Sequence, residues 1–475
     1  MLKKALIYAL VAYIFLYIIF LFVHLHLIPL VWIDEIMGLD PGLRLFTGKG
    51  LSSYLWPQVG SEEILLAYLP MQSVLHCAHL WFIPLDPYWV RIPWALYLIL
   101  GTTIFFLFLR KQHFSLIFSL FIISIILNEK SIFETTRGVR IEPFIFLILA
   151  LGAYAQLRGK FILQSTAASL LLFTHPNVWP IALIFYLEAL RQSYSIRQLQ
   201  VRTVVTAVIP LLCIIFFLVF IDFEVMKFVN QFLHQGSDHA VSGGLLHRLN
   251  AHFILRFWPY YVSQPWVPLT VYFALGYAVY QVFKKNATYL SYSIILTHVV
   301  WLIILGPFPR YNSILFLLSI ILIVKSIYHY VHRPKRLYIV LATICILSTA
   351  DIAGRHAMAA IQRSERDPYP VLAWLEKELP PDASFLITGY EIAYYAVAKN
   401  PKAHYFLYNI PPYKYPFEEY DEYYLLLDRP LATCTQVANY KVTTSKLSEN
   451  IGKKTYRTMY LQTCSDINIY QKVLE

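Results

Sequence analysis

The chain has 475 residues, of which 58% are hydrophobic and only 14% are charged. This composition excludes a soluble globule for its first three quarters and indicates a polytopic α-helical membrane protein. The net charge of +11 comes from Lys and Arg grouped in short clusters between apolar runs, where they set membrane orientation, so we exclude nucleic-acid binding.

The apolar runs and basic clusters alternate along the chain. With the clusters placed in the cytoplasm, the pattern predicts about eleven spans, an inside N-terminus and an outside C-terminus. The first run is too long for the apolar part of a signal peptide, so we expect it to remain attached. The expected spans are 5–31, 91–109, 113–128, 143–157, 161–174, 178–190, 203–221, 266–283, 289–306, 313–331 and 337–353.

Several of the central runs are short. A run of about 14 residues gives a helix of about 21 Å, which is less than the thickness of the hydrocarbon layer. We therefore expect a recess at the outer surface, where polar residues collect: Glu129, Glu134, Arg137, Arg140, Glu142, Thr174 and His175.

The first outer loop, residues 32–90, begins with the neighbouring carboxylates Asp34 and Glu35. Its apolar stretches are interrupted by Pro70, Gln72, His76 and His79. They are typical of helices that lie along the membrane interface and do not cross it.

The composition changes after Asp351. An amphipathic helix at about 369–379, a Pro-Pro-Asp turn and an apolar strand predict a small α/β domain outside the membrane. We therefore expect a membrane domain at 1–353 and a C-terminal extracytoplasmic domain at 354–475. Cys434 and Cys464 both fall in the second domain, and whether they form a disulfide stays open.

Five motifs occur in order along residues 1 to about 330: the Asp-Glu pair, "YWVRIPWAL", "RGVRIEPFIFLILAL", "LLLFTHPNVW" and "PRYN". Together they resemble the GT-C superfamily of membrane glycosyltransferases, in particular the branch of protein O-mannosyltransferases and lipid A aminoarabinose transferases. The resemblance implies an inverting glycosyltransferase of the cytoplasmic membrane. It would move a hexose or pentose from a polyprenyl-phosphate donor to a lipid, glycan or protein acceptor at the outer face.

The resemblance implies that Asp34 is the general base; the alternatives are a solvated interface carboxylate or an N-cap of the next helix. Glu35 would orient Asp34 or contact the acceptor. Glu142 matches the second acidic position of the family, with a structural ion pair to Arg137 or Arg140 as the alternative.

The departing lipid phosphate needs cations. Arg137 and Arg140 are candidates because a guanidinium binds phosphate through two hydrogen bonds. Arg310, followed by Tyr311, is a second candidate, with a snorkelling interfacial arginine as the alternative. His175 would bind phosphate in its protonated form or act as a structural residue of its turn.

The fourth outer loop contains His234, Asp238 and His239, which are weak candidates for a divalent metal because their spacing matches no ligand pattern. A solvated lid is the alternative, and no cofactor is obligatory. Two other functions compete with the enzyme. A transporter or lipid flippase would favour charges near the bilayer midplane, and a non-catalytic envelope assembly subunit would use its outer domain to bind partners.

Overall fold

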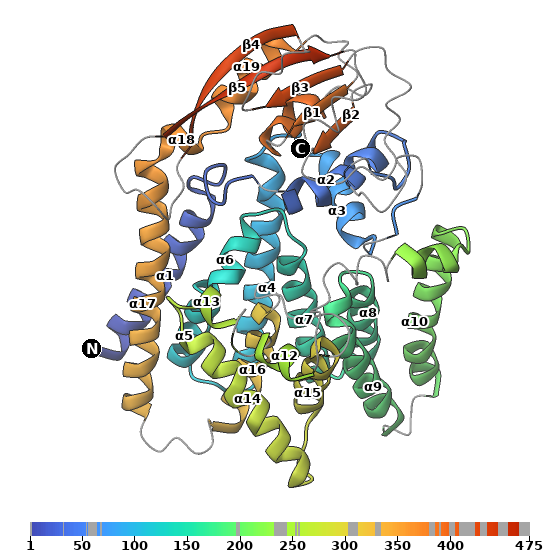
Figure 1. Cartoon of the computed structure of the whole chain (residues 1–475). Helices are drawn as coiled ribbons and strands as arrows, with labels where there is room; N and C mark the ends of the chain where they lie inside the picture. Colours follow the sequence, from blue (N-terminus) through green and yellow to red (C-terminus); the bar gives the residue numbers. More distant parts are fainter. Residues whose placement is uncertain are drawn as a thin grey trace. The chain divides into compact units, whose positions relative to one another are not determined.

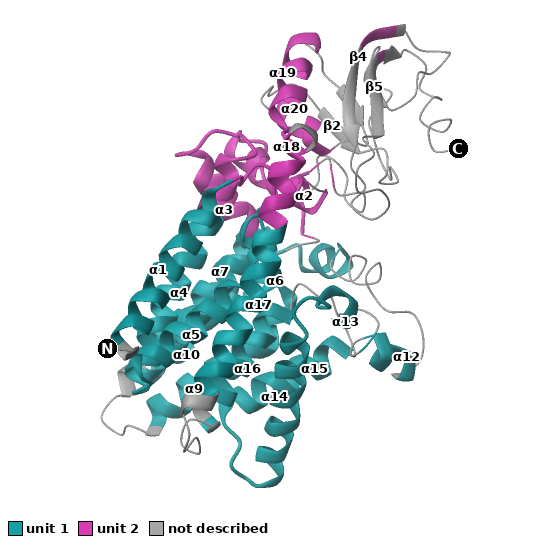
Figure 2. Cartoon of the chain, turned by 90° about the vertical axis from the view of Figure 1, so that its left-hand side faces the viewer, with its two compact units in different colours: residues 1–23, 68–71, 93–354 teal, residues 24–67, 72–92, 355–475 magenta. Residues whose placement is uncertain are grey.

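The computed structural model describes residues 2–31, 33–53, 55, 64–66, 69–195, 200–231, 245–251, 254, 257–302, 312–327, 334–379, 385–388, 391–398, 404–407, 423–427, 435–444 and 455–464. These residues form two compact units (Figure 2). Unit 1 comprises Met1–Val23, Tyr68–Met71 and Pro93–Gly354, and unit 2 comprises His24–Ala67, Gln72–Ile92 and Arg355–Glu475.

Unit 1 is built from helices (Figure 1). Among the described residues, five helices are long and apolar enough to cross a membrane, or six if the bent pair α5 and α6 is one span. The prediction of a polytopic helical membrane protein is thus confirmed. The helices are α1 (Leu2–Phe22), α4 (Ile92–Lys111), α5 (Leu116–Leu127), α6 (Lys130–Thr136), α7 (Glu142–Leu157), α8 (Phe161–Leu172), α9 (Trp179–Ser195), α10 (Gln200–Phe220), α12 (Leu245–Asn250), α13 (Phe257–Tyr260), α14 (Trp266–Phe283), α15 (Tyr289–Val300), α16 (Asn312–Ile327) and α17 (Pro334–Ile361).

The first helix is shorter than predicted. Hydropathy gave one span at 5–31, but α1 ends at Phe22. His24 adopts φ 55°, and its carbonyl accepts from the backbone N–H groups of Leu27 and Ile28. The apolar residues that follow Phe22 therefore form turns, which an apolar count does not distinguish from helix. The acidic pair is consequently not at the end of the first helix.

One of the short runs, 161–174, forms a short helix as predicted: α8 has 12 residues, so it is about 18 Å long and shorter than the hydrocarbon layer. α15 also has 12 residues, although a span of ordinary length was expected at 289–306. Helices α5 and α6 meet at an angle of 63°. The Glu129 carboxylate caps α6 at this bend by accepting from the N–H groups of Ser131 (2.9 Å) and Ile132 (2.7 Å).

Unit 2 combines helices with one sheet. The helices are α2 (Ile33–Phe46), α3 (Met71–Leu80), the 3-10 turn η1 (Trp89–Arg91), α18 (Arg363–Arg366), α19 (Tyr369–Glu378), the 3-10 turn η6 (Glu391–Ala393) and α20 (Tyr394–Val397). The predicted amphipathic helix is confirmed as α19, whose buried side is formed by Val371, Leu372 and Leu375.

The sheet has five strands in the order β2-β1-β3-β5-β4 (Figure 1). β1 lies parallel to β2 and β3, whereas β5 lies antiparallel to both β3 and β4. Ile387 pairs with Leu425, which pairs with Gln462. The strands are β1 (Phe385–Thr388), β2 (His404–Leu407), β3 (Tyr423–Leu427), β4 (Thr435–Thr444) and β5 (Thr455–Cys464).

Candidate functional site

The predicted base, Asp34, lies in the first turn of α2. It follows Ile33, the first residue of the helix, so it is not the N-cap that the sequence offered as an alternative. Its side chain is half-buried. A carboxylate in a first turn is stabilised by the helix dipole, and partial exposure leaves it accessible to a second molecule.

Glu35, the next residue, is fully buried. Its Oε2 accepts from Arg91 Nη2 at 2.6 Å and its Oε1 accepts from Arg91 Nε at 3.2 Å. Neither side chain of this pair is exposed. A two-bonded guanidinium and carboxylate satisfy each other in a buried place where either alone would be costly. Glu35 is therefore held in place and is not presented to solvent.

Arg91 also fixes the backbone that precedes α2. Its Nη1 donates to the carbonyls of Leu25 (2.7 Å) and Pro29 (2.8 Å). These carbonyls belong to the turns after α1, which have no helix ladder to satisfy them. Arg91 thus binds both the approach to α2 and the residue next to Asp34.

A second carboxylate of α2 is also engaged. Ser53 Oγ donates to Asp40 Oδ2 at 2.5 Å, and the Tyr394 hydroxyl donates to Asp40 Oδ1 at 3.3 Å. Arg44, near the end of α2, donates through Nε to Ser52 Oγ at 2.7 Å. The buried side of α2 is therefore held by polar contacts along its length.

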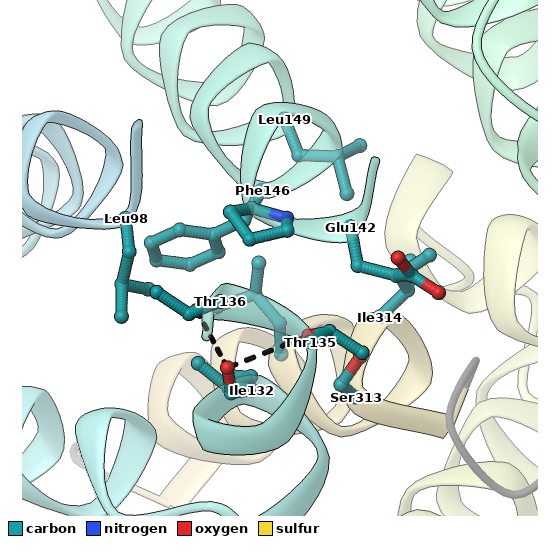
Figure 3. A pocket seen from close by; sticks show the side chains of 11 residues that line it. Leu98, Ile132, Thr135, Thr136, Glu142, Phe146, Leu149, Ser313 and Ile314 are labelled. Carbon is teal, nitrogen blue, oxygen red and sulfur yellow. Dashed lines mark hydrogen bonds between the residues drawn. The ribbon is translucent and has the colours of Figure 1, made fainter. Parts of the chain in front are cut away.

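In unit 1, Glu142 forms the ion pair with Arg140 that was the alternative to its role as the second acidic position of the site. Arg140 Nη2 donates to Glu142 Oε1 at 3.0 Å, and both side chains are at least nine-tenths buried. Glu142 begins α7 and also lines a small pocket with room for about one water molecule. Figure 3 shows this pocket, which is lined by Leu98, Ile132, Thr135, Thr136, Glu142, Pro143, Phe146, Leu149, Ser313, Ile314 and Leu317.

Arg137 is used inside the protein. Its Nη1 donates to the carbonyls of Phe20 (2.8 Å) and Leu21 (2.7 Å), and its Nη2 donates to that of Val23 (2.8 Å). The last carbonyls of a helix have no partner within the helix, so this guanidinium caps the end of α1. These contacts support a structural role for Arg137, whereas its predicted role as a phosphate ligand stays a prediction.

His175 precedes the 3-10 turn η2 (Pro176–Val178) and caps it: its Nδ1 accepts from the N–H of Asn177 at 3.2 Å. A nitrogen that accepts carries no proton, so this contact matches the neutral, structural alternative.

Other predicted residues lie outside the described part of the chain: Arg310, Tyr311, His234, Asp238, His239 and Cys434. Within the described residues, no group of three or more His, Cys, Asp or Glu side chains is arranged to hold a metal.

No role was predicted for Arg91 from the sequence, although Arg91 lies within the motif "YWVRIPWAL". The available signal was a basic residue on the predicted outer side, at the start of a span. Nor was a role predicted for Tyr394 and Tyr395, which donate to Asp40 and Glu35, respectively. No local sequence pattern marks these tyrosines, because their partners are distant in the chain. Asp40 lies 354 residues before Tyr394, and Glu35 lies 360 residues before Tyr395.

No family model matches the chain, and no curated protein matches it in sequence. Its structure is similar to the crystal structure of ArnT from Cupriavidus metallidurans bound to undecaprenyl phosphate, with a TM-score of 0.61 and 11% sequence identity. The match covers 95% of this chain and 97% of that chain. This similarity shows that the two chains share a fold.

Proposed function

We propose that this chain is a membrane glycosyltransferase that takes a sugar from a polyprenyl-phosphate donor. The observation that carries the proposal is a fold shared with ArnT over 95% of the chain, at a TM-score of 0.61. That protein was crystallised with undecaprenyl phosphate. The half-buried Asp34 beside the immobilised Glu35 supplies a carboxylate suited to take a proton.

The proposed reaction is a single displacement with inversion. The acceptor hydroxyl oxygen attacks the anomeric carbon of the sugar and forms the new glycosidic bond. The bond from that carbon to the phosphate oxygen breaks, and the lipid phosphate leaves with the electron pair. Asp34 takes the proton of the hydroxyl, so positive charge does not build up on the attacking oxygen.

Cations must stabilise the phosphate as it leaves. We assign this role to Arg140 and to Arg310 with Tyr311. His175 would be a further phosphate ligand in its protonated form, which requires that its Nδ1 take up a proton and release the N–H of Asn177. Glu142 would hold Arg140 in place, since the two are paired at 3.0 Å. We propose that Arg137 caps the end of α1 instead, because its guanidinium already donates to three carbonyls there.

We further propose that about eleven spans place the N-terminus in the cytoplasm and residues 354–475 outside the cytoplasmic membrane, as the basic clusters require. The acceptor would be a lipid, a glycan or a protein on that outer side. No cofactor is obligatory in this scheme, and a divalent ion would be an addition to it.

The experiment is to incubate the purified, full-length protein with a panel of polyprenyl phosphates that carry different hexoses and pentoses, together with an envelope extract as the source of acceptors. We expect one donor to be consumed, free polyprenyl phosphate to appear and the transferred sugar to have the opposite anomeric configuration. Retention of configuration, or no consumption of any donor, would contradict the proposal. Movement of lipid between leaflets without consumption would favour the flippase.

A further inference from the structure

Three tyrosines of the C-terminal part of unit 2 each donate to a carboxylate that lies early in the chain. Tyr395 donates to Glu35 at 2.7 Å, Tyr394 to Asp40 at 3.3 Å, and Tyr369 to Asp86 at 3.0 Å. All six residues belong to the same compact unit. The region that follows the last span is thus bonded, through its hydroxyl groups, to the segment that contains Asp34.

The contact of Tyr395 is the most direct of the three. Its hydroxyl donates to Glu35 Oε1, the same oxygen that accepts from Arg91 Nε. Glu35 and Arg91 are fully buried, and Tyr395 is 1% exposed. A hydrogen bond to a buried carboxylate is stronger than a neutral one and has no water to replace it. Tyr395 therefore completes the set of donors that fix the residue next to Asp34.

Tyr394 acts further along the same helix. Asp40 follows Glu35 by about one and a half helical turns, and Tyr394 is also 1% exposed. Two consecutive residues of α20 thus contact α2 at two separate points. Contacts at two points restrict rotation and tilt of a helix more than one contact can.

Tyr369 contacts the segment that leads to Arg91, the partner of Glu35. It donates to Asp86 Oδ1, which also accepts from the backbone N–H groups of Tyr88 (2.8 Å) and Trp89 (3.3 Å). These N–H groups begin η1, the turn that ends at Arg91. The contact therefore steadies the element that presents the guanidinium, as Tyr395 steadies the carboxylate.

The protonation of the two buried tyrosines suits this role. Burial, and then the nearby Glu35 carboxylate, raise the pKa of Tyr395 well above its usual value. Burial and Asp40 do the same to the pKa of Tyr394. Both hydroxyls therefore keep their protons and remain donors at neutral pH.

We propose that Tyr394 and Tyr395 are positioning residues for Asp34: by bonding to Asp40 and Glu35, they hold α2 in the orientation in which its first turn presents the base. This inference rests on the proposed function. It adds that the C-terminal region of unit 2 takes part in transfer through the geometry of α2, without touching either substrate.

The test replaces one hydroxyl at a time in the full-length protein. Tyr395→Phe keeps the ring and removes the donor, and Tyr394→Phe does the same at the second contact. Tyr194→Phe is the matched control, because Tyr194 is 82% exposed on α9 in unit 1. Two properties are measured: kcat and KM for the donor that the wild type consumes, and hydrogen exchange of the α2 peptide, residues 33–46.

We expect Tyr395→Phe to lower kcat by about 10-fold or more with donor KM unchanged, because a small displacement of a catalytic group is costly while donor binding is not affected. Exchange in the α2 peptide should rise by about 10-fold. The Tyr194→Phe control should match the wild type in both. If Tyr395→Phe fails to fold, the same kinetic constants and the same hydrogen exchange are measured for Tyr394→Phe.

Two results would overturn the inference. One is unchanged exchange in α2 with kcat within about twofold of the wild type. The other is a lower melting temperature with unchanged kcat per folded molecule, since that pattern belongs to a purely structural contact. The proposed function fails differently: the wild type then consumes no donor, whereas the exchange of α2 still reports whether the tyrosines hold this helix.

Discussion

Glu35 and Arg91 form a buried two-bonded ion pair between residues that lie 56 positions apart, with Nη2 and Oε2 at 2.6 Å. This pair joins the start of α2 to η1 within unit 2. Because both charges are buried away from water, each is stabilised mainly by the opposite charge of the other. The pair therefore stabilises the turn that contains Asp34.

Removal of one partner should be strongly destabilising. Arg91→Ala leaves the Glu35 carboxylate buried without its counter-ion, which costs about 3–5 kcal/mol. The measurement is thermal or denaturant unfolding of the purified protein in detergent. Arg191→Ala is the control, because the Arg191 side chain in its pair with Glu188 is 70% exposed, and its loss should cost less than about 1 kcal/mol. Equal effects of the two variants would refute the buried-pair interpretation.

Arg137 offers a choice between a structural and a substrate role. Arg137→Ala leaves the carbonyls of Phe20, Leu21 and Val23 without this donor, so we expect a loss of about 2 kcal/mol or more in the absence of any donor lipid. Arg158→Ala is the control, since that exposed guanidinium bonds to the Tyr154 hydroxyl. A variant of Arg137 with normal stability and a raised KM for the donor would restore the phosphate role.

Gly42 permits the close approach of α2 and α3. A Cβ at this position would lie 2.4 Å from His76 Cβ and 2.9 Å from the Ser73 carbonyl oxygen. The backbone cannot move aside cheaply, so Gly42→Ala should destabilise unit 2 by about 1–3 kcal/mol. Unfolding curves of the full-length variant provide the measurement.

Gly276 is the matched control in α14, because nothing lies within 4 Å of its added Cβ. Gly276→Ala should be neutral or stabilising by up to about 1 kcal/mol, since alanine favours helix more than glycine does. If Gly42→Ala behaved like Gly276→Ala, the packing of α2 on α3 would be looser than described.

Stability should fall in acid through His79 of α3. Burial lowers the pKa of His79 to about 4, whereas an unfolded histidine titrates near 6.5. As the pH falls below about 6.5, His79 becomes protonated in the unfolded chain, whereas in the folded chain it stays neutral until about pH 4. Stability is therefore fully present above this window and is lost as the pH falls through it, by up to about 1.4 kcal/mol per pH unit.

His79→Gln should reduce that slope, which unfolding at several pH values between 7 and 4 measures directly. His113→Gln is the control, because His113 is exposed at the end of α4. A slope that is the same in the wild type and in His79→Gln would show that other groups account for the acid sensitivity.

Much of unit 1 could be predicted because apolar runs determine where membrane helices lie. The run at 266–283 coincides with α14 (Trp266–Phe283), and the run at 203–221 nearly coincides with α10. The end of α1 could not be found in this way. Residues 23–31 are mostly apolar, like the helix before them, but they form turns. Backbone carbonyls in these turns accept hydrogen bonds from side chains in distant parts of the chain, Arg137 and Arg91.

The same distinction applies to the site. Arg140 and Glu142 are two residues apart, and their pairing was foreseen as an alternative. The partners of Glu35 are Arg91 and Tyr395, at separations of 56 and 360. Contacts at such separations depend on the folded arrangement, and a single sequence has no local signal for them. For the sheet, only the apolar strand after the Pro-Pro-Asp turn was predicted, which became β1.

The central claim concerns Asp34, and one comparison tests it most directly: the transfer rates of the wild type, Asp34→Asn and Asp222→Asn with the donor that the wild type consumes. Asn keeps the shape of the side chain but cannot take the proton, so we expect Asp34→Asn to lose at least about 100-fold in kcat with donor binding retained. Asp222 is exposed with φ 50°, a conformation that Asn tolerates, so its variant should match the wild type. Transfer by Asp34→Asn within a few-fold of the wild-type rate would contradict the account.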